Sequence, residues 1–384
     1  MTTSSNKGPG RILHVLWNME IGGAERALFQ FVREQRARGI HADVLLGANA
    51  GLYGERTRNE LGAAVYELGM KGPFDTARGN AAREIMRDYD IMHFHSAELG
   101  LIRIASQKPH PRLFYTHRAG MFTYDLKRLL RYKLTGWYLR RHFSGISGNT
   151  GQACDAASTL FRIPREQIRV TYNGIDFSLL NPVRTRREML DELKESDGDI
   201  IRIGTSANLR RLKRIHLLID AVARLADRPV HCYVLGDGPA REELVEQARR
   251  QGIADRVTFT GKVERVGDYL QLFDIFVLPS GPEESFGNSA VEAMGVGIPT
   301  IIFADGGGLV EHVDNDNTGY VVRDVAELTE RLSHLIASPD DRRRIGDAAR
   351  REMNDRYSPT RMVERYLDLY ESQKSKGKSQ KEGL

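Results

Sequence analysis

Two glutamates, Glu284 and Glu292, stand eight positions apart in the segment ESFGNSAVE, which follows an apolar run typical of a buried strand. If a helix begins within this segment, the two carboxylates lie about two turns apart. The N–H groups of its first turn, around Phe286, Gly287 and Asn288, would then be free to bind a phosphate. A carboxylate at each end suits two hydroxyl-bearing groups, such as a sugar and a ribose. The segment therefore predicts a site that combines phosphate and hydroxyl binding.

A second motif, GGAER, follows the first apolar run of the chain. Gly22 and Gly23 would let backbone N–H groups approach an anion at the start of a helix, where the helix dipole also favours negative charge. The same two glycines equally suit a tight turn without a ligand. The motif by itself therefore leaves two alternatives open, a phosphate or sugar contact and a purely structural turn.

Strands and helices alternate in the N-terminal half of the chain. Residues 23–39 carry apolar side chains at helical spacing, and Gly39 is expected to end this helix. Runs rich in Val, Ile and aromatic residues predict strands at residues 11–17, 42–48, 91–96, 112–117, 143–147 and 168–174. Alternation of this kind predicts a parallel, doubly wound α/β sheet.

The same pattern restarts in the C-terminal half. Strands are predicted at residues 201–206, 231–236, 256–261, 275–280, 300–304 and 319–323. The charged segment 181–199 between the halves is interpreted as a linker with a short helix. We therefore expect Rossmann-like domains at residues 1–180 and 200–357, with ligands at the carboxyl ends of the strands and in the cleft between the domains. The polar tail 374–384 is expected to be disordered.

The composition is typical of a globular protein with two domains. The chain has 384 residues, 41% hydrophobic and 28% charged, and single cores stop growing near ~250–300 residues. No apolar stretch approaches the ~20 residues that a membrane-spanning helix needs, and the run at residues 11–17 is too short for a signal peptide. Cys154 and Cys232 show no metal or redox spacing. A reducing cytoplasm is the expected location.

Basic charge is concentrated in the N-terminal half. Residues 1–180 carry a net charge of +9 and the remainder −4, and ten Lys or Arg residues face a single acid between Arg103 and Arg141. Within residues 124–143 the basic residues alternate with Leu, Trp and Tyr. This pattern suits peripheral contact with an anionic membrane, and a core-packed or solvated basic helix is the alternative.

Nucleic-acid binding through the same stretch would need exposed aromatic side chains. We expect a helix there to bury most of its aromatic residues, which are Tyr124, Tyr132, Trp137 and Tyr138. No nucleic-acid partner is therefore expected.

No pattern in the sequence predicts a metal site. Asp314 and Asp316 resemble an Asp-x-Asp metal motif, but they lie in the polar run DNDNTG, which is typical of a turn. His93 and His95 share one side of a predicted strand and Phe94 the other. The two histidines could line the acceptor side of a cleft or simply end a strand, because a zinc site would need more ligands.

Several motifs together resemble the retaining GT-B glycosyltransferases of family four. The segment ESFGNSAVEAMGVGIP resembles the family's signature, in which E-x7-E is followed by small residues and Gly-x-Pro. The resemblance covers residues 11–370, and the further motifs occur in the family's order: GGAER, YTHRAG, YNGID, LGDGP, VTFTGKV, and GGGLVEHV with TGYVV. It implies two Rossmann-like domains facing across a cleft, an N-terminal acceptor domain, a C-terminal donor domain, and a final helix at 358–373 that packs on the N-terminal domain.

The resemblance also implies roles for single residues. Glu292 would hold the ribose hydroxyls, and Glu284 would contact the transferred sugar. Lys213 matches a phosphate-binding lysine, which would neutralise charge on the departing diphosphate. His117 matches a histidine near the donor's phosphate and sugar, with a structural hydrogen bond at a strand end as the alternative. The other donor contacts implied are Gly22, Gly23, Phe286, Gly287, Asn288, and, near the base, Lys262 and Val263.

One position departs from the family pattern. The family usually carries Arg five residues before the phosphate-binding lysine, where this chain has Asn208. Arg210 is assigned to the diphosphate instead, with Arg211 as the alternative. No carboxylate stands out as a covalent nucleophile. The resemblance implies a front-face substitution, in which the leaving phosphate helps to deprotonate the acceptor.

The predicted activity is that of a hexosyl- or N-acetylhexosaminyl-transferase. The donor would be a nucleotide sugar, such as a UDP- or GDP-sugar, used without a metal. The acceptor could be a glycolipid, a polysaccharide or a small glycoside, and the location would be cytoplasmic or peripheral at the inner face of the membrane.

Other functions on similar folds were weighed against transfer. A dehydrogenase is disfavoured because Gly236–Asp237–Gly238 lacks the third glycine of the G-x-G-x-x-G fingerprint. A sugar-nucleotide epimerase or a phosphorylase remains an alternative, since fold alone does not set the reaction. A non-catalytic binder is disfavoured by the complete set of Glu284, Glu292, Lys213 and His117.

Overall fold

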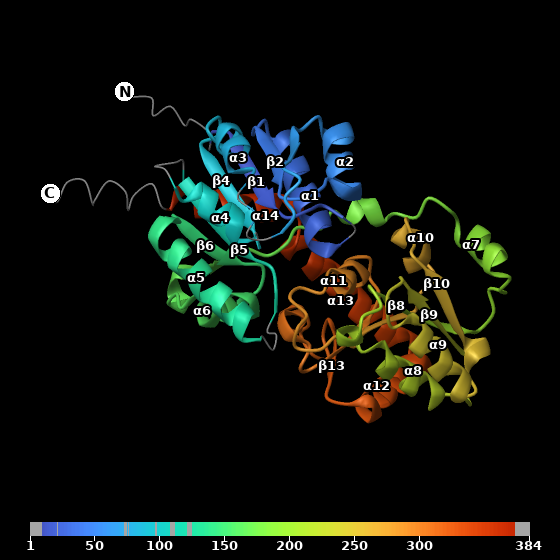
Figure 1. Ribbon diagram of the computed structural model, residues 1–384. Coiled ribbons are helices and arrows are strands. Elements are labelled where there is room, and N and C mark those ends of the chain that lie inside the picture. Colours follow the sequence, from blue (N-terminus) through green and yellow to red (C-terminus); the bar gives the residue numbers. More distant parts are fainter. Residues whose placement is uncertain are drawn as a thin grey trace, which may run out of the picture. The chain divides into compact units, whose positions relative to one another are not determined.

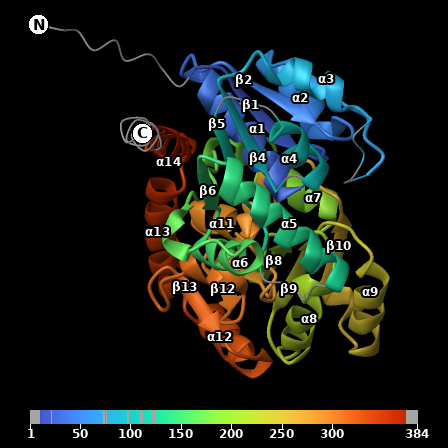
Figure 2. The same ribbon diagram turned by 60° about the vertical axis from the view of Figure 1, so that its left-hand side comes forward.

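The computed structural model describes residues 10–20, 22–72, 75, 77–96, 98–107, 112–120 and 125–372. The chain divides into two compact units. The N-terminal unit contains Met1–Gly174 together with Pro359–Leu384, and the C-terminal unit contains Ile175–Ser358. Helices surround the strands of each unit in both ribbon views, Figure 1 and Figure 2. The tail 374–384, expected to be disordered, lies outside the described residues.

The N-terminal unit is built on a seven-stranded sheet in the order β3-β2-β1-β4-β5-β6-β7. All neighbouring strands in it are parallel. The strands are β1 (Ile12–Leu16), β2 (Ala42–Leu46), β3 (Val65–Glu67), β4 (Ile91–His95), β5 (Arg112–His117), β6 (Gly145–Gly148) and β7 (Ile168–Val170). The sequence predicted six of these strands. The seventh, β3, is a short strand at the edge of the sheet, so its apolar signal is weak.

Helices cover both faces of this sheet, and each face has its own apolar core. They are α1 (Gly23–Ala37), α2 (Gly51–Leu61), α3 (Gly79–Met86), α4 (Leu99–Ala105), α5 (Leu126–His142), α6 (Gly151–Phe161), the 3-10 turn η1 (Arg165–Gln167) and α14 (Pro359–Glu371). Helix α14, red in Figure 1, belongs to this unit although it ends the chain. Its Val363, Tyr366 and Tyr370 are fully buried in the core that also contains Phe31 of α1.

The C-terminal unit contains a six-stranded parallel sheet in the order β10-β9-β8-β11-β12-β13. Its strands are β8 (Ile201–Ser206), β9 (Val230–Leu235), β10 (Val257–Gly261), β11 (Ile275–Leu278), β12 (Thr300–Phe303) and β13 (Gly319–Val322). Its helices are α7 (Arg186–Leu193), α8 (Ile215–Ala223), α9 (Arg241–Arg250), α10 (Val266–Leu270), α11 (Asn288–Gly295), α12 (Val325–Ala337) and α13 (Pro339–Arg356). Its 3-10 turns are η2 (Phe177–Leu180), η3 (Arg211–Lys213), η4 (Ala254–Arg256) and η5 (Gly307–His312). Two parallel sheets with helices around them confirm the predicted doubly wound α/β class.

The segment expected to be a linker, residues 181–199, lies within the C-terminal unit. Helix α7 in this segment begins with a capping box between Thr185 and Glu188. Its Met189 and Leu190 are buried in an apolar cluster with Tyr233 and other side chains of the second sheet. The charged residues of the segment concealed these two apolar anchors, so the segment is a packed part of the unit.

The strand order in each sheet reverses at one point, between β1 and β4 in the first unit and between β8 and β11 in the second. Doubly wound sheets bind ligands beside the carboxyl ends of the strands at such points. The loops that follow β1, β4, β8 and β11 are therefore the places to look for a functional site.

Candidate functional site

An ion pair between Lys213 and Glu284 lies at the carboxyl edge of the second sheet. Lys213 ends the turn η3 after β8, and Glu284 lies in the loop after β11. The hydroxyl of Ser280 donates a hydrogen bond of 2.9 Å to the Glu284 Oε2 atom that also contacts Lys213 Nζ. The side chains of Lys213 and Glu284 are 20% and 11% exposed. A cation and a carboxylate therefore meet at this edge, and both side chains keep some exposure to solvent.

Backbone hydrogen bonds hold the loops around this ion pair together. The N–H of Gly281 donates to the carbonyl of Leu212 at 3.0 Å, which joins the loop after β11 to η3. The N–H of Gly308 donates to the carbonyl of Glu284 at 2.9 Å, which joins the same loop to η5. Residues far apart in sequence thus keep Glu284 beside Lys213.

Helix α11 begins four residues after Glu284, and glycine is required at the position before its first residue. Gly287 has φ +72°, and a Cβ atom there would lie 2.5 Å from Leu309 Cδ1. Phe286 is 3% exposed, and its ring centroid lies 4.4 Å from that of His312. Asn288 starts the helix, and the N–H groups of Ala290 and Val291 donate to the carbonyl of Gly287 at 2.9 and 3.2 Å. The sequence motif thus forms a loop-to-helix junction whose N-terminus carries the positive end of the helix dipole.

Glu292, the second glutamate of the motif, lies on α11 and is only 3% exposed. It is therefore more enclosed than Glu284, although both belong to the same loop and helix. The eight-residue spacing places one carboxylate that is partly exposed and one that is buried.

The residues expected to bind a diphosphate lie in the loop after β8. Asn208 and Arg210 are exposed, and the carbonyl of Asn208 accepts the Arg210 N–H at 2.7 Å. Arg211 is 87% exposed and pairs with Glu243 at 3.2 Å. The N–H of Lys213 donates to the carbonyl of Arg210 at 2.9 Å, so this loop joins Lys213 through its backbone.

Sequence reasoning missed Arg214, the residue after Lys213. Its guanidinium donates to the carbonyl of Pro279 at 2.8 Å and to Asp305 at 2.6 Å. This contact ties the loop after β11 to the loop after β12 and lowers the pKa of the Asp305 carboxyl. The run of basic residues at 210–214 was the available signal, but it could not show which cation is structural.

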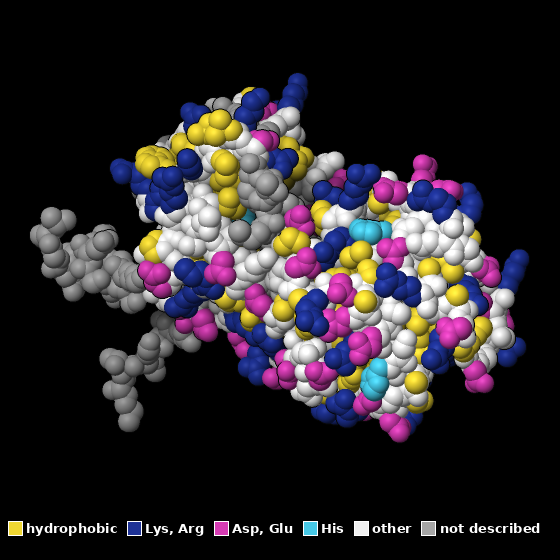
Figure 3. Space-filling view, turned by 90° about the horizontal axis from the view of Figure 1, so that it is seen from below, with side chains coloured by type: hydrophobic (Ala, Val, Ile, Leu, Met, Phe, Trp, Pro, Cys, Tyr) yellow, Lys and Arg dark blue, Asp and Glu magenta, His cyan; other side chains and the backbone are white. Residues whose placement is uncertain are grey.

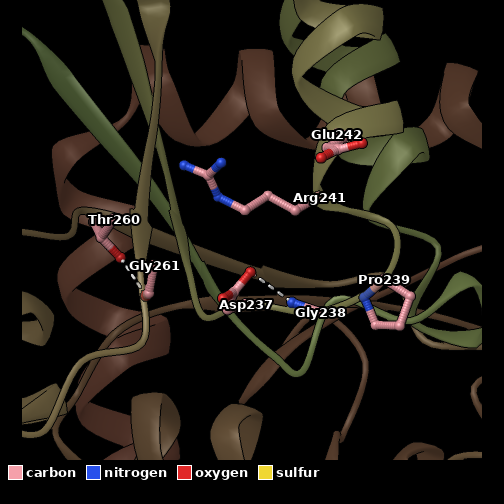
Figure 4. Close-up of a pocket in the computed structure, with 7 residues that line it drawn as sticks. All are labelled: Asp237, Gly238, Pro239, Arg241, Glu242, Thr260 and Gly261. Atoms are coloured by element: carbon pink, nitrogen blue, oxygen red, sulfur yellow. Dashed lines mark hydrogen bonds between the residues drawn. The ribbon is translucent and has the colours of Figure 1, made fainter.

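A pocket of about 590 Å³ opens at the carboxyl ends of β9 and β10, shown in Figure 4. Its walls are Asp237, Gly238, Pro239, Arg241, Glu242, Thr260 and Gly261. The Asp237 carboxylate accepts the N–H of Gly238 at 2.8 Å and so stiffens the loop after β9. Lys262, exposed, and Val263, half-buried, follow this wall directly. The residues expected near a base therefore adjoin a pocket, although Lys213 and Glu284 are not among its walls.

In the N-terminal unit, His117 ends β5 with an unusual lack of partners. It is 2% exposed, and neither ring nitrogen has a hydrogen-bond partner within the described residues. Its ring packs edge-on against Phe161 at 5.4 Å between centroids. Burial lowers the pKa of His117 to about 4, so the imidazole is neutral near pH 7. The alternative of a structural hydrogen bond is not found in the described part of the chain.

The glycine pair at the start of α1 makes room for a carboxylate. Gly22 has extended backbone, and a Cβ atom there would lie 2.1 Å from Glu25 Oε2. Gly23 is exposed at the first position of α1. Burial raises the pKa of Glu25, a residue to which the sequence assigned no role.

Three buried histidines, His14, His93 and His95, meet on one face of the first sheet, where candidate ligand atoms lie within 4.8 Å of one another. The Nδ1 atom of His14 lies 3.0 Å from Nε2 of His95. Both ring nitrogens of His93 are partnered, by Tyr370 and Thr116 at 2.7 Å each. The sequence identified His93 and His95 but missed His14, which the parallel register of β1 and β4 places opposite His93.

The arrangement of these histidines does not fit a metal ion as it stands. Arg118 donates to Nδ1 of His95 at 3.3 Å, so the ring proton of a neutral His95 lies on Nε2, the nitrogen that faces His14. A metal ligated by that nitrogen would require loss of this proton or of the arginine contact. Elsewhere, Asp314 accepts from Asn317 at 2.9 Å and Asp316 from Asn315 at 2.9 Å, as in a polar turn.

Helix α5 carries an exposed apolar surface. Leu126, Leu130, Leu134 and Trp137 are 47% to 72% exposed, whereas Tyr132 and Tyr138 pack against the core. The expectation that the helix buries most of its aromatic residues is met for the two tyrosines and is wrong for Trp137; Tyr124 lies outside the described residues.

Hydrophobic and basic side chains lie next to one another at the upper left of the face shown in Figure 3. On α5 the exposed basic residues include Lys127, Arg128 and Lys133. None of the helices in the described residues is both long and apolar enough to cross a bilayer.

Comparison with protein-family models gives two matches. Residues 21–179 match the model described as glycosyltransferase family 4, and residues 200–338 match the model described as glycosyl transferases group 1. The two matches fall in the N-terminal and C-terminal units respectively. Together they span most of the chain.

Comparison with curated proteins gives relatives with glycosyltransferase names. A putative glycosyltransferase of Bacillus subtilis, EpsF, is 28% identical over 77% of this chain and 80% of its own length. The N-acetyl-alpha-D-glucosaminyl L-malate synthase of Bacillus anthracis is 30% identical over 54% of each chain.

Among solved structures, HepE from Anabaena, crystallised with UDP and glucose, superposes with a TM-score of 0.78. The match covers 94% of this chain and all of HepE at 20% identity. At that identity the likeness concerns the fold, which is shared over nearly the whole chain.

Proposed function

Because the chain belongs to the group 1 glycosyltransferases of the GT-B fold, we propose that it transfers a hexosyl or N-acetylhexosaminyl group from a nucleoside-diphosphate sugar to an acceptor hydroxyl, with retention of configuration. One observation carries this proposal. The Lys213–Glu284 pair lies at the carboxyl edge of the second sheet, beside the first turn of α11. A cation for phosphate, a carboxylate for sugar hydroxyls and a helix N-terminus are thus gathered in one place.

The chemistry required is cleavage of the bond between the sugar's anomeric carbon and the diphosphate. Lys213 would leave Glu284 and contact the diphosphate, so that negative charge on the leaving group is stabilised as the bond breaks. Glu284 would then accept hydrogen bonds from the sugar. The acceptor oxygen bonds to the anomeric carbon on the face that the leaving group vacates, and the acceptor proton passes to a phosphate oxygen.

The remaining donor contacts follow from their places at the same edge. Asn208 and Arg210 would contact the diphosphate, Phe286, Gly287 and Asn288 would present the α11 N–H groups, and Glu292 would hold the ribose. Lys262 and Val263 would lie near the base, next to the pocket of Figure 4. In the N-terminal unit, Gly22, Gly23 and the unpartnered His117 would contact the donor's phosphate and sugar.

The nucleotide is proposed to be UDP or GDP, bound without a metal. The solved relative contains UDP and glucose, and the name of the Bacillus anthracis relative includes an N-acetylglucosaminyl group. Lys213 and the α11 N–H groups supply positive charge that a metal supplies elsewhere.

A thermal-shift screen with UDP, GDP, dTDP and ADP, and with their sugar conjugates, tests this proposal with and without magnesium. Ligand binding to the native state raises the unfolding temperature by mass action. A shift with one nucleotide family that is independent of magnesium is expected. A shift with NAD alone, or no shift with any nucleotide, would contradict the proposal.

Product analysis separates transfer from the two alternatives on the same fold. Incubation with the bound donor and a mixed acceptor extract should release nucleoside diphosphate in step with a new glycoside. Release of sugar 1-phosphate on addition of phosphate would indicate a phosphorylase, and a changed sugar still attached to its nucleotide would indicate an epimerase.

We further propose that α5 contacts an anionic membrane from the cytoplasmic side, with a glycolipid or polysaccharide as the acceptor. Apolar side chains that insert and cations that pair with lipid phosphates together give interfacial binding. Replacing Leu130 and Leu134 by Ser should lower binding to anionic vesicles, while Leu179→Ser, an equally exposed leucine of the other unit, should not. Binding that is absent for the native chain, or equal in all three proteins, would contradict membrane contact through α5.

A further inference from the structure

Arg118, the residue after β5, is held by three neutral acceptors. Its Nη1 atom donates to Oδ1 of Asn173 at 2.7 Å, and its Nη2 atom donates to the hydroxyl of Tyr366 at 3.3 Å. Its Nε and Nη2 atoms lie 3.3 and 3.2 Å from Nδ1 of His95. Its own N–H donates to the hydroxyl of Ser96 at 2.8 Å. The guanidinium is therefore fixed in position by groups that carry no negative charge.

No carboxylate neutralises this arginine within the described part of the chain. Among the described residues, its hydrogen bonds go to Asn173, Tyr366 and His95, and Glu25 acts on it through its charge at longer range. His95 is neutral near pH 7, because burial holds its pKa well below the usual value, and a protonated ring would only add positive charge. A partly buried cation without an anionic partner is costly, and an arriving anion would relieve that cost.

The direction of the hydrogen bonds fixes the histidine rings. A guanidinium can only donate, so Nδ1 of His95 accepts and its Nε2 carries the proton. That proton is donated to Nδ1 of His14 across 3.0 Å, which leaves Nε2–H of His14 to donate to Oε1 of Gln35 at 2.8 Å. These hydrogen bonds form a series that runs in one direction from Arg118 to Gln35, which is fully buried on α1.

This series of hydrogen bonds makes Arg118 a rigid binding group. Because His95 is held by His14 and His14 by Gln35, the ring that accepts from the guanidinium cannot turn freely. The hydroxyl of Tyr366, fully buried on α14, accepts from Nη2 as well, and Asn173 accepts from Nη1. An arginine fixed before its ligand arrives loses less side-chain entropy on binding.

The location is one where ligands bind. Arg118 follows β5 and His95 ends β4, next to the point at which the strand order reverses. His117 packs against Phe161 on one face of the sheet, whereas Arg118 contacts Tyr366 on the other. The two neighbouring residues therefore face different groups, and a donor that reaches His117 leaves Arg118 for another ligand.

We propose that Arg118 binds an anionic group, a phosphate or a carboxylate, on the acceptor, and that His95 and His14 are positioning residues for it. This inference rests on the proposed transfer function, because it assigns the acceptor to the N-terminal unit. Guanidinium groups pair with both anions through two parallel hydrogen bonds. The acceptor is accordingly an anionic molecule that also carries the hydroxyl to be glycosylated.

The test measures binding of inorganic phosphate and of glycerol 3-phosphate to the full-length chain carrying Lys213→Ala, which removes the proposed donor-phosphate cation. In that background, Arg118→Gln should raise the phosphate dissociation constant about tenfold, the loss of about one charge-assisted pair. The exposed Arg169→Gln is the matched control and should leave it unchanged. Arg118→Lys keeps the charge but cannot form two parallel hydrogen bonds, so it should give an intermediate dissociation constant. It replaces Arg118→Gln in the test if that variant does not fold.

Nucleotide binding, measured with intact Lys213, separates the two proposals. Arg118→Gln should leave the affinity for the nucleotide unchanged. An equal loss of phosphate and nucleotide affinity would assign Arg118 to the donor diphosphate and overturn the acceptor assignment. If Arg118→Gln leaves the phosphate dissociation constant unchanged, the anion site itself is overturned. Absence of any nucleotide binding would contradict only the transfer function.

The positioning role has its own readout. His95→Leu removes the acceptor for Arg118 and should weaken phosphate binding several-fold, and His95→Gln, whose side-chain oxygen can accept the same hydrogen bond, should restore part of it. If both variants lower the unfolding temperature but keep the parental phosphate affinity, the histidine chain is structural only.

Discussion

The carboxyl edges of the two sheets handle positive charge in opposite ways. In the C-terminal unit, Lys213 is paired with Glu284 and Arg214 with Asp305. In the N-terminal unit, Arg118 is held by Asn173, Tyr366 and His95, all of them neutral. A phosphate that binds to Lys213 must replace a carboxylate, whereas an anion that binds to Arg118 replaces nothing charged.

This difference has a consequence for catalysis. The side chains of Lys213 and Glu284 are only 20% and 11% exposed, so Lys213 would leave Glu284 only when a phosphate takes the place of the carboxylate. In the proposed mechanism, this exchange would free the carboxylate for the sugar as the lysine takes the phosphate. The arginine of the other unit would suit recognition instead, because neutral groups already hold it in position.

The largest effect is expected from Lys213→Ala. Loss of the cation that stabilises the leaving diphosphate should lower kcat/KM about 10²–10³-fold, by analogy with removal of other transition-state stabilising groups. The matched control is Arg211→Ala, since Arg211 is 87% exposed and pairs with Glu243. Steady-state kinetics with the identified donor measures both variants, and equal losses would remove the distinction between these neighbouring cations.

Glu284→Gln should affect turnover more than donor affinity. The amide cannot accept as strongly from sugar hydroxyls or pair with Lys213, so kcat should fall by about 10-fold to 100-fold. Donor affinity should change little, because release of Lys213 from its ion pair offsets part of the lost contact. A large loss of donor affinity with kcat intact would show that Glu284 binds the ground state only.

Acidification should destabilise the N-terminal unit more than the C-terminal unit. In the N-terminal unit, burial lowers the pKa of His14 and of His117 to about 4 and holds the pKa values of His93 and His95 well below the usual value. Among the described residues of the C-terminal unit, His312 is the histidine that is buried to the same degree. The unfolded chain binds protons below about pH 6.5 and the native histidines do not, so stability is lost as the pH falls from 6.5 towards 4.

Each such histidine contributes up to about 1.4 kcal/mol per pH unit in this window. Hydrogen exchange of the two units between pH 7 and 5 measures the loss separately. Equal acid sensitivity in both units would argue against the buried histidines as its source.

The smallest effect is expected from a glycine substitution at the carboxyl edge of the sheet in the C-terminal unit. Gly287→Ala meets both a positive φ and a contact of 2.5 Å with Leu309, and should lower the free energy of unfolding by ~1–3 kcal/mol. Gly69→Ala is the control in the N-terminal unit, since Gly69 also has positive φ but nothing within 4 Å of the added Cβ. Denaturant unfolding of the two variants isolates the cost of the contact.

Much of the fold could be read from local patterns. Buried parallel strands are short apolar runs, and twelve of the runs predicted from the sequence contain strands of the two sheets. The pattern failed where apolar residues were few, at the three-residue strand β3 and at Met189 and Leu190 in a charged segment. The two alternatives for residues 124–143 could not be separated, because exposure of Leu130 and Trp137 depends on how α5 packs.

The candidate site was visible only in part. The ESFGNSAVE segment indicated a loop-to-helix junction, and the positive φ of Gly287 agrees with a need for glycine there. Lys213 was assigned through a family resemblance, since nothing local marks it as the partner of a glutamate 71 positions away. Arg118 and His14 carried no signal, because a lone Arg after a strand and a lone His within one are common.

The sequence by itself determined which segments become strands and helices, since periodicity and glycine placement are local properties of the chain. It also determined where N–H groups and carboxylates would stand together in a single motif. The tertiary structure decided which charges are paired and which are not, because partners such as Arg118 and His95, or Lys213 and Glu284, come from different strands. Whether a cation is neutralised depends on these distant contacts, and that distinction separates the two edges of this protein.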